Sequence, residues 1–154
     1  MILILSNDND LSTLQVTKWL NHMGCNWKRI NNDTPIGLTS MSFGNKKTSE
    51  ITFKTKKGDV IRTSELQSYW YRRANFTFDI DLSLSELEDD ELRELMKDHC
   101  VSELSYLRDG MHAVLANIKS ISDRRYSDLN KYDVLLMAQL AELQVPDTII
   151  TTSR

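Results

Sequence analysis

The chain has 154 residues, of which 40% are hydrophobic, which is enough for one ordinary core, so we expect a single domain spanning residues 1–154. The formal net charge of −3 gives no overall attraction to nucleic acid or to an anionic membrane, so neither is expected as a partner. No apolar run is long enough to span a bilayer, and residues 1–6 lack the features of a signal peptide. We therefore expect a cytoplasmic protein.

The first thirty residues alternate between strand and helix patterns. Residues 1–5 are a continuous apolar run, typical of a strand that is covered on both faces. A helix is predicted to begin near Leu11, capped by Asp10 or Ser12, and to end before Gly24, which suits the left-handed C-terminal position. A second strand is predicted over residues 26–31. These three elements form a βαβ unit. The helix has a broad apolar face, made of Leu11, Leu14, Val16, Trp19, Leu20 and Met23.

A pattern of period two then replaces the helical one. Residues 38–43, 50–55 and 60–63 are short segments rich in β-forming residues, and Gly58 can supply a positive φ angle in the turn between the last two. We therefore expect a hairpin or meander inserted after the second strand. Residues 66–72 return as a strand whose aromatic side chains, Tyr69, Trp70 and Tyr71, favour core packing.

From Ser83 onward the pattern is helical. Ser83 or Ser85 can cap the first helix, and the acidic residues through Asp98 are expected to form a solvated face. A seam of apolar residues follows along one side of the helix, and we expect it to pack in the core. Any part of the seam that the core does not cover would form a homodimer interface. The seam consists of Cys100, Leu104, Leu107, Met111, Val114 and Ile118. A last helix is predicted around residues 129–143, followed by a strand over residues 147–152.

The sequence lacks the motifs of several common classes of enzyme and metal site. The five glycines form neither GxGxxG nor GxxxxGK[ST], no serine lies in a GxSxG motif, and the three histidines are scattered. Cys25 and Cys100 lie far apart, so we expect neither a zinc site nor a disulfide and place both in the core. A phosphate-receiver domain is disfavoured because Asp33 lies in a turn that is followed by a hairpin rather than by a helix.

The ordered set of motifs resembles a known family, the ATP-grasp ribosomal peptide maturases, in particular the grasp-with-spasm type related to the microviridin (graspetide) ligases. Gln144 stands where that family usually has a glycine before the Val-Pro step. The motifs that carry the resemblance are residues 1–6, 11–13, 16, 19–20, 29–31, 69–73, 130–131 and 143–151.

The resemblance implies an α/β, Rossmann-like pre-ATP-grasp domain with an inserted β-hairpin or meander and a long helical second half. Such ligases use ATP and Mg²⁺ to convert an Asp or Glu side chain of a precursor peptide into an acyl phosphate, which a Ser, Thr or Lys side chain then attacks to close an ester or amide ring. The central and C-terminal ATP-grasp domains that carry those sites have no counterpart in this chain. We therefore expect no catalytic residue here and no ATP or Mg²⁺ bound to this chain alone.

Two adjacent arginines, Arg72 and Arg73, follow the aromatic strand. Ligands of open α/β sheets gather at the carboxyl ends of the strands, so we expect one of them to pair with a substrate carboxylate or a phosphate. The alternative is an exposed arginine that pairs with the acidic segment 86–98. Lys131, which matches the family pattern before the last helix, is a further candidate for a phosphate contact, although an exposed lysine at a helix start is the commoner case.

A second class of function stays open on the sequence alone. The chain could be a free-standing α/β module that binds a peptide or a protein without catalysis, as the helical seam and the hairpin edge suggest. In the ligase interpretation, the partners are the ribosomal precursor peptide and the ATP-grasp domains of the same polypeptide. A second copy of the chain would bind through the part of the apolar seam that the core does not cover.

Overall fold

The computed structural model describes residues 1–44, 49–84, 88–122, 124, 130–149 and 151. The chain divides into two compact units, Met1–Arg124 and Arg125–Arg154, which are described separately below.

A parallel three-stranded sheet lies at the centre of the first unit. It has the order β2-β1-β6, formed by β1 (Ile2–Ser6), β2 (Trp27–Asn31) and β6 (Ser68–Tyr71). The apolar run of β1 suits the middle strand because both of its faces are covered, and Leu3, Ile4 and Leu5 are fully buried. The predicted βαβ unit and the aromatic strand are therefore confirmed.

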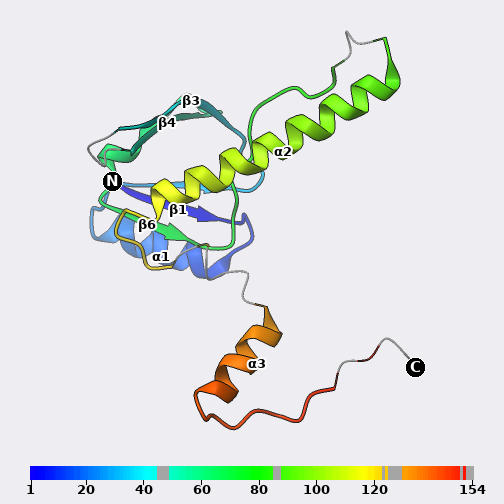
Figure 1. Ribbon diagram of the computed structural model, residues 1–154. Coiled ribbons are helices and arrows are strands. Elements are labelled where there is room, and N and C mark those ends of the chain that lie inside the picture. The colour runs from blue at the N-terminus through cyan, green and yellow to red at the C-terminus, as the bar shows by residue number, and fades with distance from the viewer. Residues whose placement is uncertain (45–48, 85–87, 123, 125–129, 150, 152–154) are drawn as a thin grey trace. The chain divides into compact units, whose positions relative to one another are not determined.

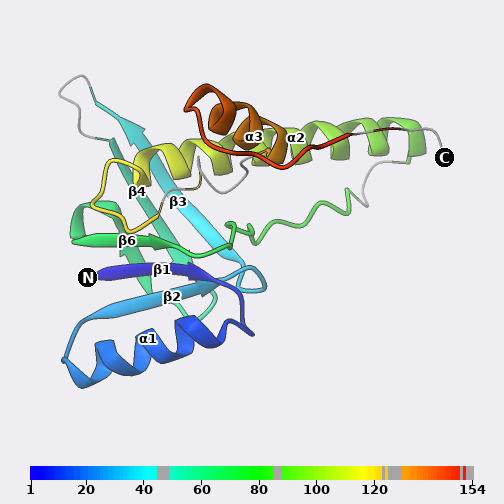
Figure 2. The same cartoon turned by 90° about the horizontal axis from the view of Figure 1, so that it is seen from below.

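Helix α1 (Leu11–His22) covers one face of this sheet (Figures 1 and 2). The Asp10 carboxylate caps it, and Gly24 adopts a φ of 66°, both as predicted. Contact with the sheet is made by small polar side chains, because the Thr13 and Ser6 hydroxyl oxygens lie 2.9 Å apart in the interior. Most of the larger apolar side chains of α1 are exposed, with Leu11 and Trp19 at 74% and 66%, whereas Leu20 is half-buried.

An antiparallel meander follows β2. It consists of β3 (Ile36–Phe43), β4 (Ser49–Thr55) and β5 (Val60–Arg62), with a register shift between Leu38 and Ser40. Gly58, with a φ of 88°, makes the tight turn before β5. A short 3-10 helix, η1 (Thr63–Glu65), leads back toward β6, and the Thr63 hydroxyl oxygen accepts the Ile51 N–H at 2.9 Å. The predicted insertion is confirmed.

One hydrophobic core lies between the meander, the second face of the parallel sheet and the last turns of α2 (Asp90–Leu115). Because side chains alternate along a strand, the odd-numbered residues of β1 and β6 enter this core, whereas Ser6 faces α1. The core consists of Leu3, Leu5, Ile30, Ile36, Ile51, Phe53, Ile61, Tyr69, Tyr71, Ala74, Phe76, Met111, Val114 and Leu115.

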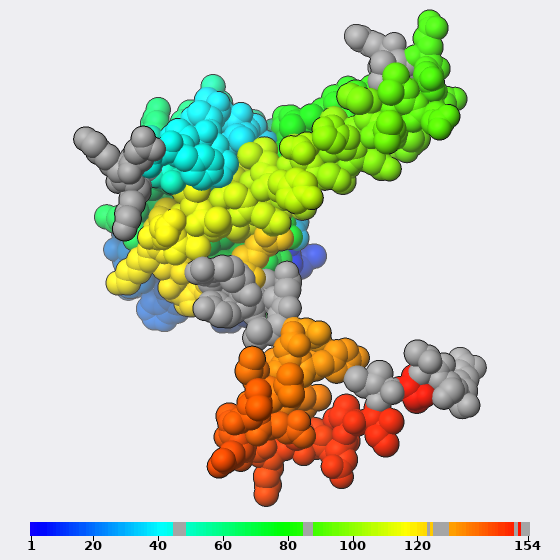
Figure 3. Space-filling model, in the orientation of Figure 1, coloured from blue at the N-terminus to red at the C-terminus, as the bar shows by residue number. Residues whose placement is uncertain are grey.

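Helix α2 begins later than the sequence predicts. Its N-cap is Asp89, whose carboxylate accepts the Leu92 N–H at 3.1 Å. Ser83 is not a cap, because the Asp81 side chain accepts its backbone N–H at 2.8 Å in a non-helical segment; Ser85 lies outside the described residues. The first half of α2 extends away from the two sheets (Figures 1 and 3). All of its buried residues lie between Met111 and Leu115.

The second unit contains α3 (Lys131–Leu140), which Asn130 caps. No residue of this helix is buried. The strand predicted over residues 147–152 is absent at its described positions, 147–149 and 151. A strand needs a neighbour to accept its backbone hydrogen bonds, and no strand pairing involves the described residues of this unit.

The two cysteines are unpaired, and the described helices are not of the membrane-spanning kind. Cys25 and Cys100 are free thiols, as expected, but both are half-buried rather than in the core. Among the described residues, no helix has the length and apolar character needed to cross a membrane.

Candidate functional site

The carboxyl ends of the three parallel strands meet at one edge of the sheet. β1 ends at Ser6, β2 at Asn31 and β6 at Tyr71, and the register aligns Leu5 with both Ile30 and Tyr71. The chain leaves the middle strand through α1 toward β2, whereas β6 pairs on the other side of β1 (Figure 2). Such a reversal of strand order is the place where open α/β sheets bind ligands. We call this region the strand-end site and define it as residues 6–10, 31–33 and 72–75.

Arg72 is held in the strand-end site by Asp10. Arg72 Nε lies 3.0 Å from Asp10 Oδ2, with the two side chains 33% and 14% exposed. The other carboxylate oxygen of Asp10 accepts the N–H groups of Ser12 and Thr13 at 3.0 and 3.2 Å. Partial burial would raise the pKa of Asp10, but the hydrogen bonds from Thr13 and Ser12 and the charge of Arg72 outweigh it and hold that pKa below its usual value.

Asparagine side chains connect the three loops that follow the strands. Asn32 Nδ2 donates to Asn7 Oδ1 at 2.6 Å, and Asn32 Oδ1 accepts the backbone N–H of Asn75 at 2.6 Å. The Thr77 hydroxyl donates to the Asn32 carbonyl oxygen at 2.6 Å. One residue after β2 therefore fixes the loops after β1 and β6, which gives the strand-end site a defined geometry.

Acidic and basic groups lie close together on the β2 side of this site. The Arg29 guanidinium donates to the carbonyl oxygens of Asn7 and Asp8, and Asn31 Nδ2 donates to the Asp8 carboxylate. A hydrogen bond with the Asp33 carboxyl, partial burial and the charge of Asp33 raise the pKa of Asp8, while Arg29 and Asn31 oppose that increase. The net effect is a pKa of Asp8 above its usual value.

The two arginines predicted as candidates are placed differently. Arg72 pairs with Asp10, which neither of the sequence-based alternatives for it had considered. Arg73 follows at a φ of 60° and is exposed. Among the described residues it has no side-chain hydrogen bond and no ion pair.

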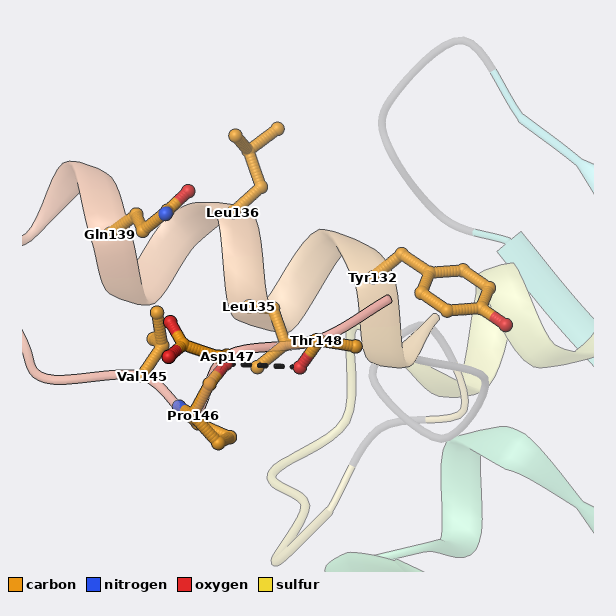
Figure 4. A pocket seen from close by; sticks show the side chains of 8 residues that line it. All are labelled: Tyr132, Leu135, Leu136, Gln139, Val145, Pro146, Asp147 and Thr148. Atoms are coloured by element: carbon orange, nitrogen blue, oxygen red, sulfur yellow. Dashed lines mark hydrogen bonds between the residues drawn. The ribbon is translucent and has the colours of Figure 1, made fainter. Parts of the chain in front are cut away.

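Lys131 belongs to the second unit, where it is the exposed first residue of α3. In the same unit, α3 and the following segment enclose a shallow hollow of about 380 Å³ (Figure 4). The Thr148 hydroxyl donates to the Pro146 carbonyl oxygen at 3.0 Å beside it. The hollow is lined by Tyr132, Leu135, Leu136, Gln139, Val145, Pro146, Asp147 and Thr148.

Sequence reasoning identified Asp10 as a helix cap but missed it as the partner of Arg72. The sequence did contain a signal for this pair. Asp10 follows β1 and Arg72 follows β6, and the carboxyl ends of neighbouring parallel strands lie side by side. The role of Asn32 could not be found in this way, since a single asparagine in an Asn-Asn-Asp turn carries no pattern of its own.

Comparison with known structures shows where this architecture recurs. The chain matches the macrocyclase MdnC bound with the precursor peptide MdnA and the macrocyclase MdnB, both from Microcystis aeruginosa MRC, each with a TM-score of 0.65 over 99% of this chain. The identities are 19% and 20%, so the likeness shows the fold. A Chryseobacterium gregarium RiPP-associated ATP-grasp ligase in complex with ADP, and a leader and core peptide, matches 95% of the chain with a TM-score of 0.58 and 20% identity.

The chain spans about half the length of these solved relatives, since it covers 48%, 54% and 42% of them respectively. None of the curated proteins compared with it matches. A family model described as the MvdD pre-ATP grasp domain matches residues 1–126, which include the whole strand-end site and α2. The Rossmann-like expectation is thus confirmed, and the chain belongs to the MvdD pre-ATP-grasp domain family.

Proposed function

We propose that this chain is the N-terminal domain of an ATP-dependent ligase that forms side-chain ester or amide macrocycles in a ribosomal precursor peptide. Membership of the pre-ATP-grasp family over residues 1–126 supports the proposal. So do the solved neighbours, which are a macrocyclase with a precursor peptide and an ATP-grasp ligase with ADP and leader and core peptides. The proposal includes central and C-terminal ATP-grasp domains that this chain does not contain.

The reaction that we assign to the whole ligase begins with transfer of a phosphoryl group from ATP to a carboxylate of the peptide. This activation is needed because a carboxylate is a poor electrophile until one oxygen becomes a good leaving group. Mg²⁺ and ATP are cofactors of the whole ligase. Among the described residues, no three His, Cys, Asp or Glu side chains gather in a way that could hold a metal ion.

The contribution of this chain is to form one wall of the cleft and to help dock the peptide. The observation that carries this role is the strand-end site, where Asp10 holds the Arg72 guanidinium at the carboxyl edge of the sheet and Asn32 fixes the loop that contains Arg73. A guanidinium there offers a planar pair of donors to a carboxylate or a phosphate. Lys131 remains a candidate for a phosphate contact from the second unit.

The partners in this proposal are the precursor peptide, the ATP-grasp domains of the same polypeptide and, in a homodimer, a second copy. We place the reaction in the cytoplasm, where the precursor is synthesised. Neither nucleic acid nor a membrane has a part in it.

One observation favours the alternative of a free-standing binding module without catalysis. The outer face of α1 exposes Leu11, Trp19 and Met23, and a shallow hollow of about 440 Å³ lies beside Trp19, Lys18 and His22. Exposed apolar surface of this kind marks interaction sites. In a binding module, this surface of α1 would bind the partner itself. In a ligase, it would contact another part of the assembly.

The experiment that separates the two functions is a modification assay. The polypeptide that carries this chain is purified from its source cells and incubated with MgATP and a precursor-type peptide that contains acidic residues together with Ser, Thr and Lys. The ligase proposal predicts that the peptide loses the mass of one water for each ring and that the loss requires ATP. Binding of the peptide without any change in its mass would instead establish the binding module.

A further inference from the structure

The loop after β6 is anchored immediately before Arg73. The backbone N–H of Arg72 donates to the Leu5 carbonyl oxygen at 2.7 Å, which extends the β1–β6 pairing by one residue. The Arg72 side chain is held by the Asp10 carboxylate at 3.0 Å. Asp10 is itself fixed by the two N–H groups at the start of α1. Arg72 therefore has little freedom to turn toward a ligand.

The same loop is anchored immediately after Arg73. Ala74 is 1% exposed, and Phe76 is fully buried in the core. The backbone N–H of Asn75 donates to Asn32 Oδ1 at 2.6 Å, and the Phe76 carbonyl oxygen accepts a hydrogen bond from Arg108 Nε at 3.0 Å. These contacts hold the backbone on the far side of Arg73, as β1 and Asp10 hold it on the near side.

Arg73 lies between these two anchored segments and differs from them in its backbone conformation and its side-chain contacts. Its φ of 60° falls in the left-handed region, which is uncommon for a residue other than glycine and costs conformational energy. Its side chain is exposed, and among the described residues it has no hydrogen bond or ion pair. The fold thus presents an unpaired guanidinium on a fixed stretch of backbone at the carboxyl edge of the sheet.

We infer that Arg73 is the residue that contacts an anionic group of the substrates, and that Asp10 and Arg72 are positioning residues that hold its loop. This inference rests on the proposed ligase function and divides roles between two arginines that the sequence leaves equivalent. The anion is a group that presents two or more acceptor oxygens to the guanidinium. Both a carboxylate of the precursor peptide and a phosphate of ATP have this chemistry, so the experiment must distinguish these two sources.

Steady-state kinetics of the full polypeptide test the contact. Arg73→Ala should raise the KM for one substrate about tenfold or more, because it removes a charge-assisted hydrogen bond, and Arg73→Lys should fall between it and the wild type. A rise in the KM for the peptide identifies the carboxylate, and a rise in the KM for ATP identifies the phosphate. Arg62→Ala is the matched control, since Arg62 is also exposed but pairs with Glu65 outside the strand-end site. Unchanged kcat and KM in Arg73→Ala would overturn the inference.

Nitrogen-15 NMR of the arginine Nε–H groups in this chain tests the positioning role without any enzyme assay. The Arg72 Nε–H should exchange slowly with solvent and lose this protection in Asp10→Asn, which can still cap α1. The Arg73 Nε–H should exchange rapidly in both proteins. Equal exchange of the two groups in the wild type would contradict the division of roles. If the wild-type polypeptide modifies no peptide, the proposed function fails, whereas this NMR result still decides the positioning role of Asp10.

Discussion

Arg72 and Asp10 join the end of β6 to the beginning of α1 through a contact of 3.0 Å between Nε and Oδ2. The two residues are far apart in sequence, but the parallel pairing of β1 with β6 brings the ends of both strands to the same edge. Asp10 thus serves two elements at once, as the N-cap of the helix and as the anion of an ion pair. Its removal should therefore affect both.

Asp10→Ala should lower the free energy of unfolding by about 1–2 kcal/mol, the usual cost of removing a helix cap, with a further loss from the ion pair. Asp10→Asn should cost less, because an asparagine also caps. Urea unfolding of the 154-residue chain at neutral pH measures both. Equal stability of Asp10→Ala and the wild type would show that the contact with Arg72 does not form in solution.

The stability that Asp10 contributes should depend on pH. Its pKa is lowered in the folded state, so its contribution is complete above the unfolded value near 3.8 and disappears as the pH falls through the folded pKa. The wild type should therefore lose more stability than Asp10→Asn when the pH is lowered from 5 to about 2.5. Parallel pH profiles of the two proteins would exclude this linkage.

Asp8 should show the opposite behaviour. Its pKa is raised by Asp33, so the folded state binds the proton more tightly, and the stability from that proton is lost as the pH rises through the folded pKa. Asp8→Asn should consequently raise the free energy of unfolding at pH 7 and have less effect at acid pH. Asp33→Asn is the matched variant, because it removes the same repulsion from the other side. A decrease in stability at pH 7 in both variants would contradict the assignment.

Trp19→Ala should change the free energy of unfolding by less than about 1 kcal/mol, because the side chain is 66% exposed. Leu3→Ala is the contrasting variant and should cost about 2–5 kcal/mol, since Leu3 is fully buried in the core. Thermal or urea unfolding compares them directly. A large loss in Trp19→Ala would mean that the apolar face of α1 is covered in the isolated chain.

The strands could be predicted from sequence because each carries its own pattern. The apolar run of β1 and the aromatic run of β6 are found at their predicted places, and the meander follows the period-two segments. The orientation of α1 was less predictable, because an apolar face normally packs inward. Here the Thr13 hydroxyl pairs with Ser6 in the interior, and small side chains make the contact with the sheet.

The candidate site was predictable in its location but not in its contacts. The general position of Arg72 and Arg73 followed from the end of the aromatic strand, but the pairing with Asp10 and the anchoring by Asn32 depend on which loops meet. Ser83 was predicted as a cap, but the Asp81 side chain accepts its backbone N–H, and the cap of α2 is Asp89. Local competition of this kind between side chain and helix has no periodic signal.

The intact mass of the native polypeptide shows whether this chain works as one domain of a larger ligase. An antibody raised against the chain would isolate the polypeptide from its source cells for mass spectrometry. We predict a species well above 17.8 kDa, the mass of the 154 residues, with room for ATP-grasp domains. A species of 17.8 kDa that copurifies with no ATP-grasp protein would contradict this prediction.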